Sequence, residues 1–293
     1  KADAYGHGSV RCAEVLRDNG VKRFAVATIE EALELREAGF NESILILGLV
    51  PEDCTDIIIE QNLTIVVGSL DRAKKKSEIA VKRGAVIDCF IAIDSGMGRI
   101  GYRIETPLEK EFARTEIEEI DELEGLRING MVSHFATSDE ADSTYTNKQL
   151  SLFNDFYEEL AGCGINVPML CIANSAAIMD YPKTHFDAVR PGIILYGCYP
   201  SEEVDKTRLD LKPVMSVKAY IIHIKTVPAG TSISYGRRFI ADRESKIATI
   251  SIGYADGYSR TLTGKAEVLV HGHRVPVVGS ICMDQCMIDV TDV

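Results

Sequence analysis

Short hydrophobic runs alternate with amphipathic stretches over the first two thirds of the chain. The hydrophobic runs are rich in β-branched residues, which is typical of buried strands in a parallel sheet. The stretches between them place apolar residues on one helical face, as Ile29, Leu33 and Ala38 do before Gly39. The pattern predicts strands at residues 24–27, 44–49, 64–67, 86–93, 128–133, 168–172 and 188–190.

A helix or a turn is predicted after each of these strands. A further helix at residues 10–19 has no strand before it, so Lys1 looks like the end of a first strand whose body precedes the sequence. Strand–helix alternation fits both an open doubly wound sheet and a closed barrel, and a series of eight such units favours a (β/α)8 TIM-type barrel. The predicted helices are residues 10–19, 29–38, 51–61, 70–83, 106–123, 144–161 and 175–179.

The hydrophobic period changes to two from about residue 210 onward. Gly, Pro and Asp turns separate the alternating runs, which indicates a second, all-β domain. We therefore predict a barrel domain over residues 1–209, which lacks its first strand in this sequence, and a β-rich C-terminal domain over residues 210–293. Its predicted strands are residues 217–225, 246–252, 266–270, 275–278 and 287–290.

Composition and charge exclude several classes of protein and of binding partner. The 293 residues are 46% hydrophobic, which excludes a disordered chain, and the formal charge of −12 argues against nucleic-acid binding. No apolar run approaches the ~20 residues of a membrane helix, so we expect no membrane contact within this segment. The eight cysteines are scattered without a CxxC pair. They favour reduced thiols in a cytoplasmic protein over a disulfide framework or a metal site.

Candidate chemistry gathers at the predicted C-terminal ends of the strands, where barrels carry their active sites. Ser175 and Arg190 stand in the last two loops, where barrels commonly bind phosphate. A lysine at a strand end is flanked by low-dielectric walls that favour a nucleophilic amine, so Lys1 opposite a phosphate site suggests an imine to pyridoxal phosphate (PLP). A surface lysine is the alternative that spacing alone would favour. The polar residues at these ends are Lys1, Tyr5, Arg99, His134, Ser175 and Arg190.

A series of motifs in the same order resembles the bacterial alanine racemase family over essentially the whole chain. The resemblance implies PLP as cofactor, interconversion of L- and D-alanine for peptidoglycan, and a head-to-tail homodimer with shared active sites. It also implies that the β-domain runs on past Val293 and is truncated here. The motifs are Lys1-Ala-Asp-Ala-Tyr-Gly-His-Gly8, Asp94-Ser-Gly-Met-Gly-Arg-Ile-Gly101, Ser133-His-Phe-Ala-Thr-Ser-Asp139, Ala173-Asn-Ser175, Val189-Arg-Pro-Gly-Ile193, Ser234-Tyr-Gly236, Gly253-Tyr-Ala-Asp-Gly-Tyr258 and Gly279-Ser-Ile-Cys-Met-Asp-Gln285.

The resemblance also implies a role for each matching residue. Lys1 and Tyr235, the latter from the partner subunit, would be the two catalytic bases on opposite faces of the substrate. A tyrosine ordinarily titrates near 10, so His134 and Arg190 would assist it. The implied cofactor-binding residues are Lys1, Tyr5, Arg99, His134, Ser175, Arg190, Gly192 and Ile193; the substrate-binding residues are Arg99 and Met283; the entrance residues are Asp139, Tyr254, Asp256 and Asp284; and no metal is expected.

Two departures from the family pattern keep other functions open. Many relatives carry a carbamylated lysine, which braces the arginine of the Gly-rich loop, where this chain has Ala92, and an entryway arginine where it has Ser280. These changes put strict alanine specificity in doubt and leave a serine racemase of the membrane-anchored type as an alternative. A PLP-dependent decarboxylase and a non-catalytic PLP-binding protein are further alternatives; Arg190 argues against the first and Tyr235 against the second.

Overall fold

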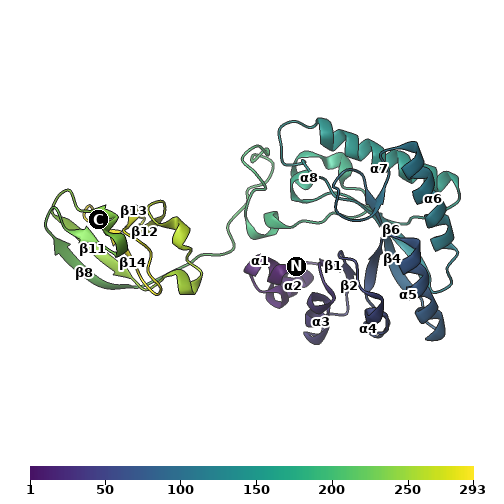
Figure 1. The fold of residues 1–293 in the computed structure, drawn as a ribbon, viewed down its shortest axis with the longest axis horizontal. Coiled ribbons are helices and arrows are strands. Elements are labelled where there is room, and N and C mark those ends of the chain that lie inside the picture. The colour runs from purple at the N-terminus through teal and green to yellow at the C-terminus, as the bar shows by residue number, and fades with distance from the viewer. The chain divides into compact units, whose positions relative to one another are not determined.

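The computed structural model describes residues 1–293, which divide into two compact units, Lys1–Met215 and Ser216–Val293 (Figure 1). The domain boundary near residue 210 stays a prediction. None of the helices combines the length and the apolar character needed to cross a lipid bilayer.

The first unit is built on a parallel sheet with the strand order β1-β2-β3-β4-β6-β7. Neighbouring strands pair in sequence order, as expected when each strand is followed by a crossover that returns to the same end of the sheet. The short strand β5 (Tyr102–Arg103) pairs only with β4. The other strands are β1 (Arg23–Val26), β2 (Ser43–Ile46), β3 (Thr64–Val67), β4 (Ile87–Asp94), β6 (Leu126–Val132) and β7 (Leu170–Cys171).

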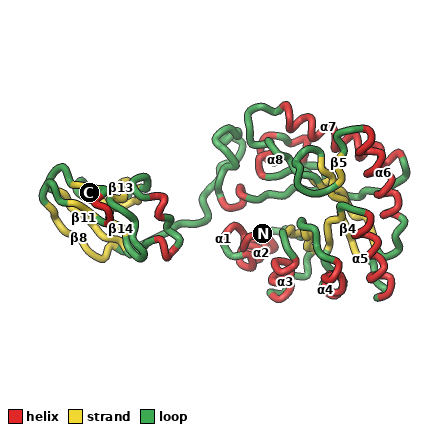
Figure 2. The backbone as a smooth tube through the Cα atoms, in the orientation of Figure 1, coloured by secondary structure: helices red, strands yellow, loops and turns green.

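Helices cover the outer side of this sheet, red outside yellow in Figure 2. Reciprocal side-chain and backbone hydrogen bonds of the capping-box type begin α3 at Thr28 and Glu31, and α6 at Thr106 and Glu109. The helices are α1 (Ala2–Gly6), α2 (Ser9–Asp18), α3 (Ile29–Glu37), α4 (Thr55–Glu60), α5 (Leu70–Lys82), α6 (Pro107–Asp121), α7 (Thr144–Gly162) and α8 (Ser175–Asp180). The 3-10 turns are η1 (Glu52–Cys54), η2 (Pro182–Thr184) and η3 (Ile193–Tyr196).

The predicted fold class, a barrel-type α/β domain followed by an all-β domain, is confirmed, but the parallel sheet is an open half-barrel. The prediction of a strand at residues 188–190 is wrong, because the structure has no strand there. The backbone of this segment forms only two separate hydrogen bonds to the β7 side of the sheet, from the Ala188 N–H to the Leu170 carbonyl (3.3 Å) and from the Arg190 N–H to the Ala173 carbonyl (2.9 Å). Two isolated bonds do not make a ladder.

The apolar core of the first unit lies between the sheet and its helices. Ile44 and Ile65 of the sheet and Phe153 of α7 are fully buried there. A smaller apolar cluster, which includes Phe90 and Ala92, occupies the inner side of the sheet. Because both faces of β3 and β4 are buried, these central strands read as continuous hydrophobic runs.

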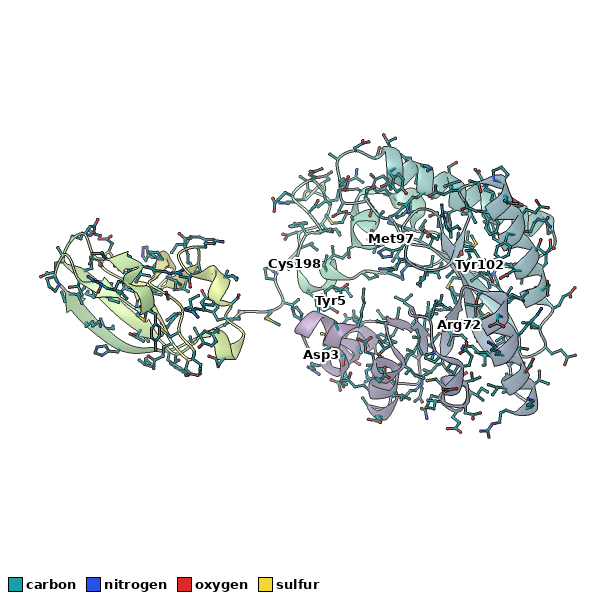
Figure 3. The ribbon with its side chains drawn as sticks, in the orientation of Figure 1. Asp3, Tyr5, Arg72, Met97, Tyr102 and Cys198 are labelled. Atoms are coloured by element: carbon teal, nitrogen blue, oxygen red, sulfur yellow. The ribbon has the colours of Figure 1, made fainter.

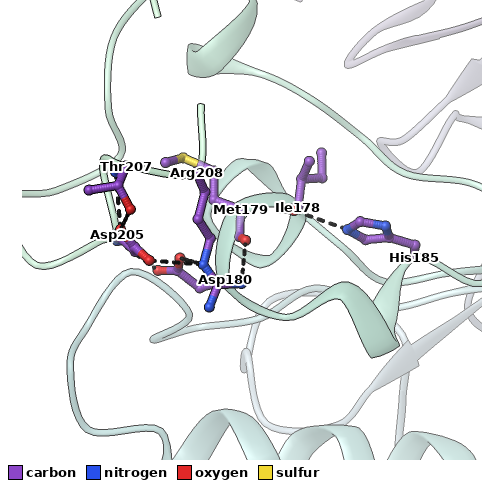
Figure 4. Close-up of polar contacts among 7 residues, drawn as sticks. All are labelled: Ile178, Met179, Asp180, His185, Asp205, Thr207 and Arg208. Atoms are coloured by element: carbon purple, nitrogen blue, oxygen red, sulfur yellow. Dashed lines mark hydrogen bonds and ion pairs between the residues drawn. The ribbon is translucent and has the colours of Figure 1, made fainter. Parts of the chain in front are cut away.

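Ionic contacts hold the segment that follows η3 against α8. The Arg208 guanidinium donates from Nε to Asp205 (3.0 Å) and from Nη1 to the Met179 carbonyl (3.2 Å), and it lies 3.8 Å from Asp180 (Figure 4). These contacts bind the segment around Arg208 to α8, the last α-helix of the first unit.

The second unit is a five-stranded antiparallel sheet with the order β12-β13-β14-β11-β8. Its core includes Ile247, Ile250 and Ile288. The strands are β8 (Ile221–Val227), β11 (Ser245–Ile250), β12 (Glu267–Val270), β13 (His273–Val278) and β14 (Cys286–Asp289), with a separate pair of β9 (Ser232–Ile233) and β10 (Phe239–Ile240). The 3-10 turns are η4 (Tyr235–Arg237), η5 (Tyr254–Asp256) and η6 (Arg260–Leu262).

Candidate active site

A cavity of about 620 Å³ runs along the inner side of the parallel sheet, from Arg23 and Ser43 at the starts of β1 and β2 to the loops at the C-terminal ends of the strands. This is the end at which barrel-type sheets place their catalytic groups. The lining brings together residues from loops that are far apart in the sequence. Of the residues singled out in the sequence, Lys1, Tyr5, His134, Asp139, Ser175, Arg190, Gly192 and Ile193 line it.

Lys1 enters this cavity from a left-handed turn, residues 1–8, which we call the Lys1 turn. Four successive residues without glycine, Ala2 to Tyr5, have φ between 47° and 57°. L-residues avoid this region, and such strain persists where the surrounding structure holds it, commonly at functional sites. Lys1 Nζ lies 5.9 Å from the centre of the Tyr5 ring. Figure 3 marks Asp3 and Tyr5 on the short α1 ribbon.

Tyr5, Ser175 and Gly192 form a small polar cradle across the cavity. The Gly192 N–H donates to Ser175 Oγ at 2.9 Å. A Cβ atom added at Gly192 would stand 2.6 Å from the Tyr5 hydroxyl and 3.6 Å from Ser175 Oγ. Only glycine leaves room for this cluster of hydroxyl and backbone groups. Hydroxyls and loop N–H groups gathered in this way suit a phosphate.

Arg190 is fixed by the ends of two strands. Its Nη1 donates to the carbonyl and Sγ of Cys171, and its Nη2 donates to the carbonyls of Ser133 and Ile172 and to His134 Nδ1 (3.1 Å). Its Nε makes no hydrogen bond within the chain. One N–H of the guanidinium is therefore free for a ligand while the others hold its plane in place.

His134 is a neutral imidazole. Burial, together with the positive charges of Arg190, Arg99 and Lys1, lowers the pKa of His134 to about 3. Because a guanidinium can only donate, Nδ1 accepts from Arg190 and the ring proton is assigned to Nε2. Gln149 of α7 supports this strand end by donating to the His134 carbonyl at 3.1 Å.

Arg99 does not line the cavity and makes no hydrogen bond or ion pair within the chain. Its loop is held through its backbone: the Asp94 carboxylate accepts from the N–H groups of Gly96 (3.0 Å) and Gly98 (2.9 Å). Ala92, which stands at the position of the lysine in relatives, is 2% exposed and packs in an apolar cluster with Phe90. The methyl group of Ala92 itself cannot carry a carbamate.

The remaining predicted residues lie in the second unit, and hydrogen bonds join the loops that carry them. Ser280 Oγ donates to the Tyr235 carbonyl at 2.8 Å, and the Ala255 N–H beside Tyr254 donates to the Met283 carbonyl at 2.9 Å. Tyr235 and Met283 are 70% and 54% exposed. Asp256 accepts from the Gly253 N–H at 3.0 Å, and Asp284 is exposed in the same loop as Met283.

Tyr196 and Glu31 are among the cavity residues that were not anticipated from the sequence. The Tyr196 ring stacks on His7 with 4.4 Å between ring centres and tilts against Tyr5 at 5.1 Å. Glu31 also lines the cavity. The Thr-x-x-Glu pattern at residues 28–31 signals a helix start, but nothing in it indicates contact with Lys1.

Comparisons with known proteins agree over the whole chain. The profile described as "Alanine racemase, N-terminal domain" matches residues 1–200, and "Alanine racemase, C-terminal domain" matches residues 214–293. The alanine racemase of Clostridium novyi (strain NT) is 50% identical over 293 residues, which are 100% of this chain and 74% of that protein.

Solved structures give the same result. The Clostridium difficile 630 alanine racemase in complex with cycloserine has a TM-score of 0.89 at 40% identity, covering 100% of this chain and 75% of that one. The Bartonella henselae alanine racemase with covalently bound pyridoxal phosphate has a TM-score of 0.87 at 32% identity, covering 100% of this chain and 78% of that one.

Proposed function

The chain belongs to the alanine racemase family, and we propose that Lys1 and Tyr235 are the two bases with which it interconverts L- and D-alanine. The enzyme is an isomerase that uses PLP, and its reaction supplies D-alanine for peptidoglycan. The observation that carries the assignment of the site is the convergence of Lys1, the Arg190–His134 pair and the Gly192 cradle on one cavity.

The residues of the cavity fit PLP. The cofactor carries a phosphate, an aldehyde and a pyridine nitrogen. The cradle of Tyr5, Ser175 and Gly192 would take the phosphate together with the Ile193 N–H, Lys1 would take the aldehyde, and the free Nε of Arg190 would donate to the ring nitrogen. When bound, PLP supplies the electron sink that stabilises negative charge at the substrate Cα.

Two bases are needed because racemisation removes a proton from one face of a planar centre and returns one to the other. In our proposal the Lys1 amine exchanges the proton on one face and the Tyr235 hydroxyl on the opposite face. In the same proposal His134, which accepts from Arg190, would link Arg190 to Tyr235, and its neutral ring carries the proton on Nε2. Arg99 and the Met283 N–H would bind the substrate carboxylate.

Arg190 controls the strength of the electron sink. A guanidinium keeps its proton and cannot protonate the pyridine nitrogen in the way a carboxylic acid can. The ring then stays a weaker sink, which disfavours transamination as a side reaction. We expect Arg190→Glu to raise transamination, measured as pyruvate formed from L-alanine; an unchanged pyruvate yield would contradict this role.

We propose a homodimer in which Tyr235 and Met283 complete the partner's site. Their high exposure within their own unit supports this arrangement, because catalytic groups are ordinarily enclosed. The test mixes inactive Lys1→Ala and Tyr235→Phe proteins. A mixed dimer has one site with both substitutions and one intact site, so mixing restores activity if the sites are shared. No recovery after subunit exchange would contradict the shared site.

The substrate test follows circular dichroism of L-alanine and L-serine in parallel. Racemisation of alanine that is lost in Lys1→Ala supports the proposal, and loss of neither activity in that variant would refute the role of Lys1. Faster racemisation of serine would support the serine racemase alternative, in line with Ser280. Asp139, Tyr254, Asp256 and Asp284 remain proposed entrance residues, and the eight unpaired cysteines support the proposed cytoplasmic setting.

A further inference from the structure

The Lys1 turn needs support from outside itself. Its conformation disfavours each L-residue by roughly 1–2 kcal/mol, and its own hydrogen bonds are local. The N–H groups of Tyr5, His7 and Gly8 donate to the carbonyls of Lys1 (3.2 Å), Ala4 (3.1 Å) and Asp3 (3.1 Å), and the Ser9 N–H donates to Asp3 Oδ1 (2.6 Å). None of these bonds ties the turn to the sheet beside it.

Glu31 links the Lys1 turn to the sheet through hydrogen bonds. One carboxylate oxygen, Oε1, accepts from the Ala2 N–H at 2.5 Å. The other, Oε2, accepts from the Ala27 N–H at 2.7 Å and from the Thr28 N–H at 3.3 Å, and lies 3.8 Å from the Lys1 backbone nitrogen. Ala27 follows the last residue of β1. One carboxylate thus joins the peptide group that follows Lys1 to the end of the neighbouring strand.

We propose that Glu31 is a positioning residue for Lys1, which fixes where the lysine amine stands in the cavity by bridging the Lys1 turn to the end of β1. The proposal rests on the proposed function of Lys1. Glu31 lines the same cavity as Lys1 and is 21% exposed, so its bonds are partly shielded from water.

The charge of Glu31 suits this bridge. Burial by itself would raise its pKa, but the hydrogen bonds from the N–H groups of Ala27 and Ala2, the positive charge of the Lys1 backbone amine and the bond from the Thr28 N–H hold the pKa of Glu31 below its ordinary value. An ionised carboxylate accepts at both oxygens, whereas an amide accepts at only one. Substitution by glutamine therefore keeps the shape and removes one half of the bridge.

A role limited to capping α3 does not account for these contacts. The capping bond to the Thr28 N–H is the longest of the three that Glu31 accepts. The two shorter bonds go to Ala2 and Ala27, which lie outside the helix. In the capping box of α6, by contrast, Glu109 accepts from the Thr106 N–H (3.0 Å) and otherwise contacts only Arg103.

The test compares Glu31→Gln with Thr28→Ala in the purified full-chain holoenzyme. Thr28→Ala removes the other half of the same cap and leaves the bridge to Ala2 intact, so it controls for helix stability. The readouts are the PLP dissociation constant, from ultrafiltration at serial dilution, and kcat and KM for L-alanine. Loss of one hydrogen bond to a charged group corresponds to about a tenfold to hundredfold change in an equilibrium constant.

We expect Glu31→Gln to weaken PLP binding by about tenfold or more and to lower kcat with little change in KM, while Thr28→Ala changes neither beyond about twofold. Equal PLP affinity in the two variants would overturn the proposal. If Glu31→Gln does not fold, Glu31→Asp, whose shorter arm cannot reach both Ala2 and Ala27, is compared in its place with the same expectation. Failure of the wild type to bind PLP or racemise alanine would refute the proposed function instead.

Discussion

Replacement of Arg190 by alanine should destabilise the protein even without its cofactor. The guanidinium donates to the carbonyls of Ser133, Cys171 and Ile172, at the ends of two adjacent strands. The Cys171 carbonyl also accepts from the Ser133 N–H at 3.1 Å, but the Ser133 and Ile172 carbonyls have no other side-chain donor, so alanine leaves these two to whatever water can enter. The perturbation is therefore structural as well as chemical.

The magnitude follows from the number of bonds. A hydrogen bond to a charged group contributes about 1.5–3 kcal/mol to stability, and the half-buried position of Arg190 argues for the lower end. The bond to Ile172 is long at 3.3 Å, so two effective bonds give a loss of about 3 kcal/mol. For a unit of this size the melting temperature should fall by about 6–12 °C.

Arg99→Ala is the matched control, because Arg99 makes no hydrogen bond or ion pair within the chain. Both variants are freed of PLP and melted by differential scanning calorimetry beside the wild type. We expect Arg99→Ala to melt within about 1 °C of the wild type. Equal melting temperatures for the two variants would refute the inference that Arg190 fastens the strand ends.

Three further measurements test other parts of the structure. Burial and nearby positive charges lower the pKa of His134 to about 3, so the stability that depends on its neutral ring is complete above about pH 6.5 and is lost as the pH falls. Between pH 7 and pH 5 the free energy of unfolding should decrease by about 2 kcal/mol for this reason. Urea titrations at the two pH values should show a smaller decrease in His134→Gln. Tyr102→Phe removes a partly buried hydrogen bond of 2.9 Å to Glu116 and should lower the free energy of unfolding, measured in urea, by about 1 kcal/mol; no change would contradict that contribution. Burial raises the pKa of Cys286 to about 11, so mass spectrometry should find the exposed Cys163 alkylated first at neutral pH, and the reverse order would contradict the burial.

The sequence predicted the layout of the strands better than it predicted their ends. The run at residues 64–67 is buried on both sides and became β3 with the same bounds. The predicted strand at residues 188–190 is only an extended segment, because pairing depends on how far β7 extends, and β7 has two residues. Hydrophobic periodicity shows which residues are buried but not how many of them form backbone hydrogen bonds with a neighbouring strand.

The candidate site, like the strands, could be predicted from the sequence only in part. Ser175 and Arg190 could be placed at one end of the sheet because parallel strands end on the same side. The contact between Ala2 and Glu31 spans 29 positions and has no signature in either segment. The left-handed Lys1 turn could not be predicted either, since Ala and Tyr ordinarily avoid that conformation and Asp adopts it only as a single residue.

The left-handed turn also has a stereochemical consequence. Its backbone angles are the mirror image of those of an ordinary helix, and they are therefore the relaxed angles of D-amino acids. A D-alanine introduced at the exposed Ala2 by chemical ligation would adopt φ near +47° without the steric cost that the L-residue bears. In this short stretch beside Lys1, the enantiomer that proteins exclude from their own chains is the one whose backbone fits.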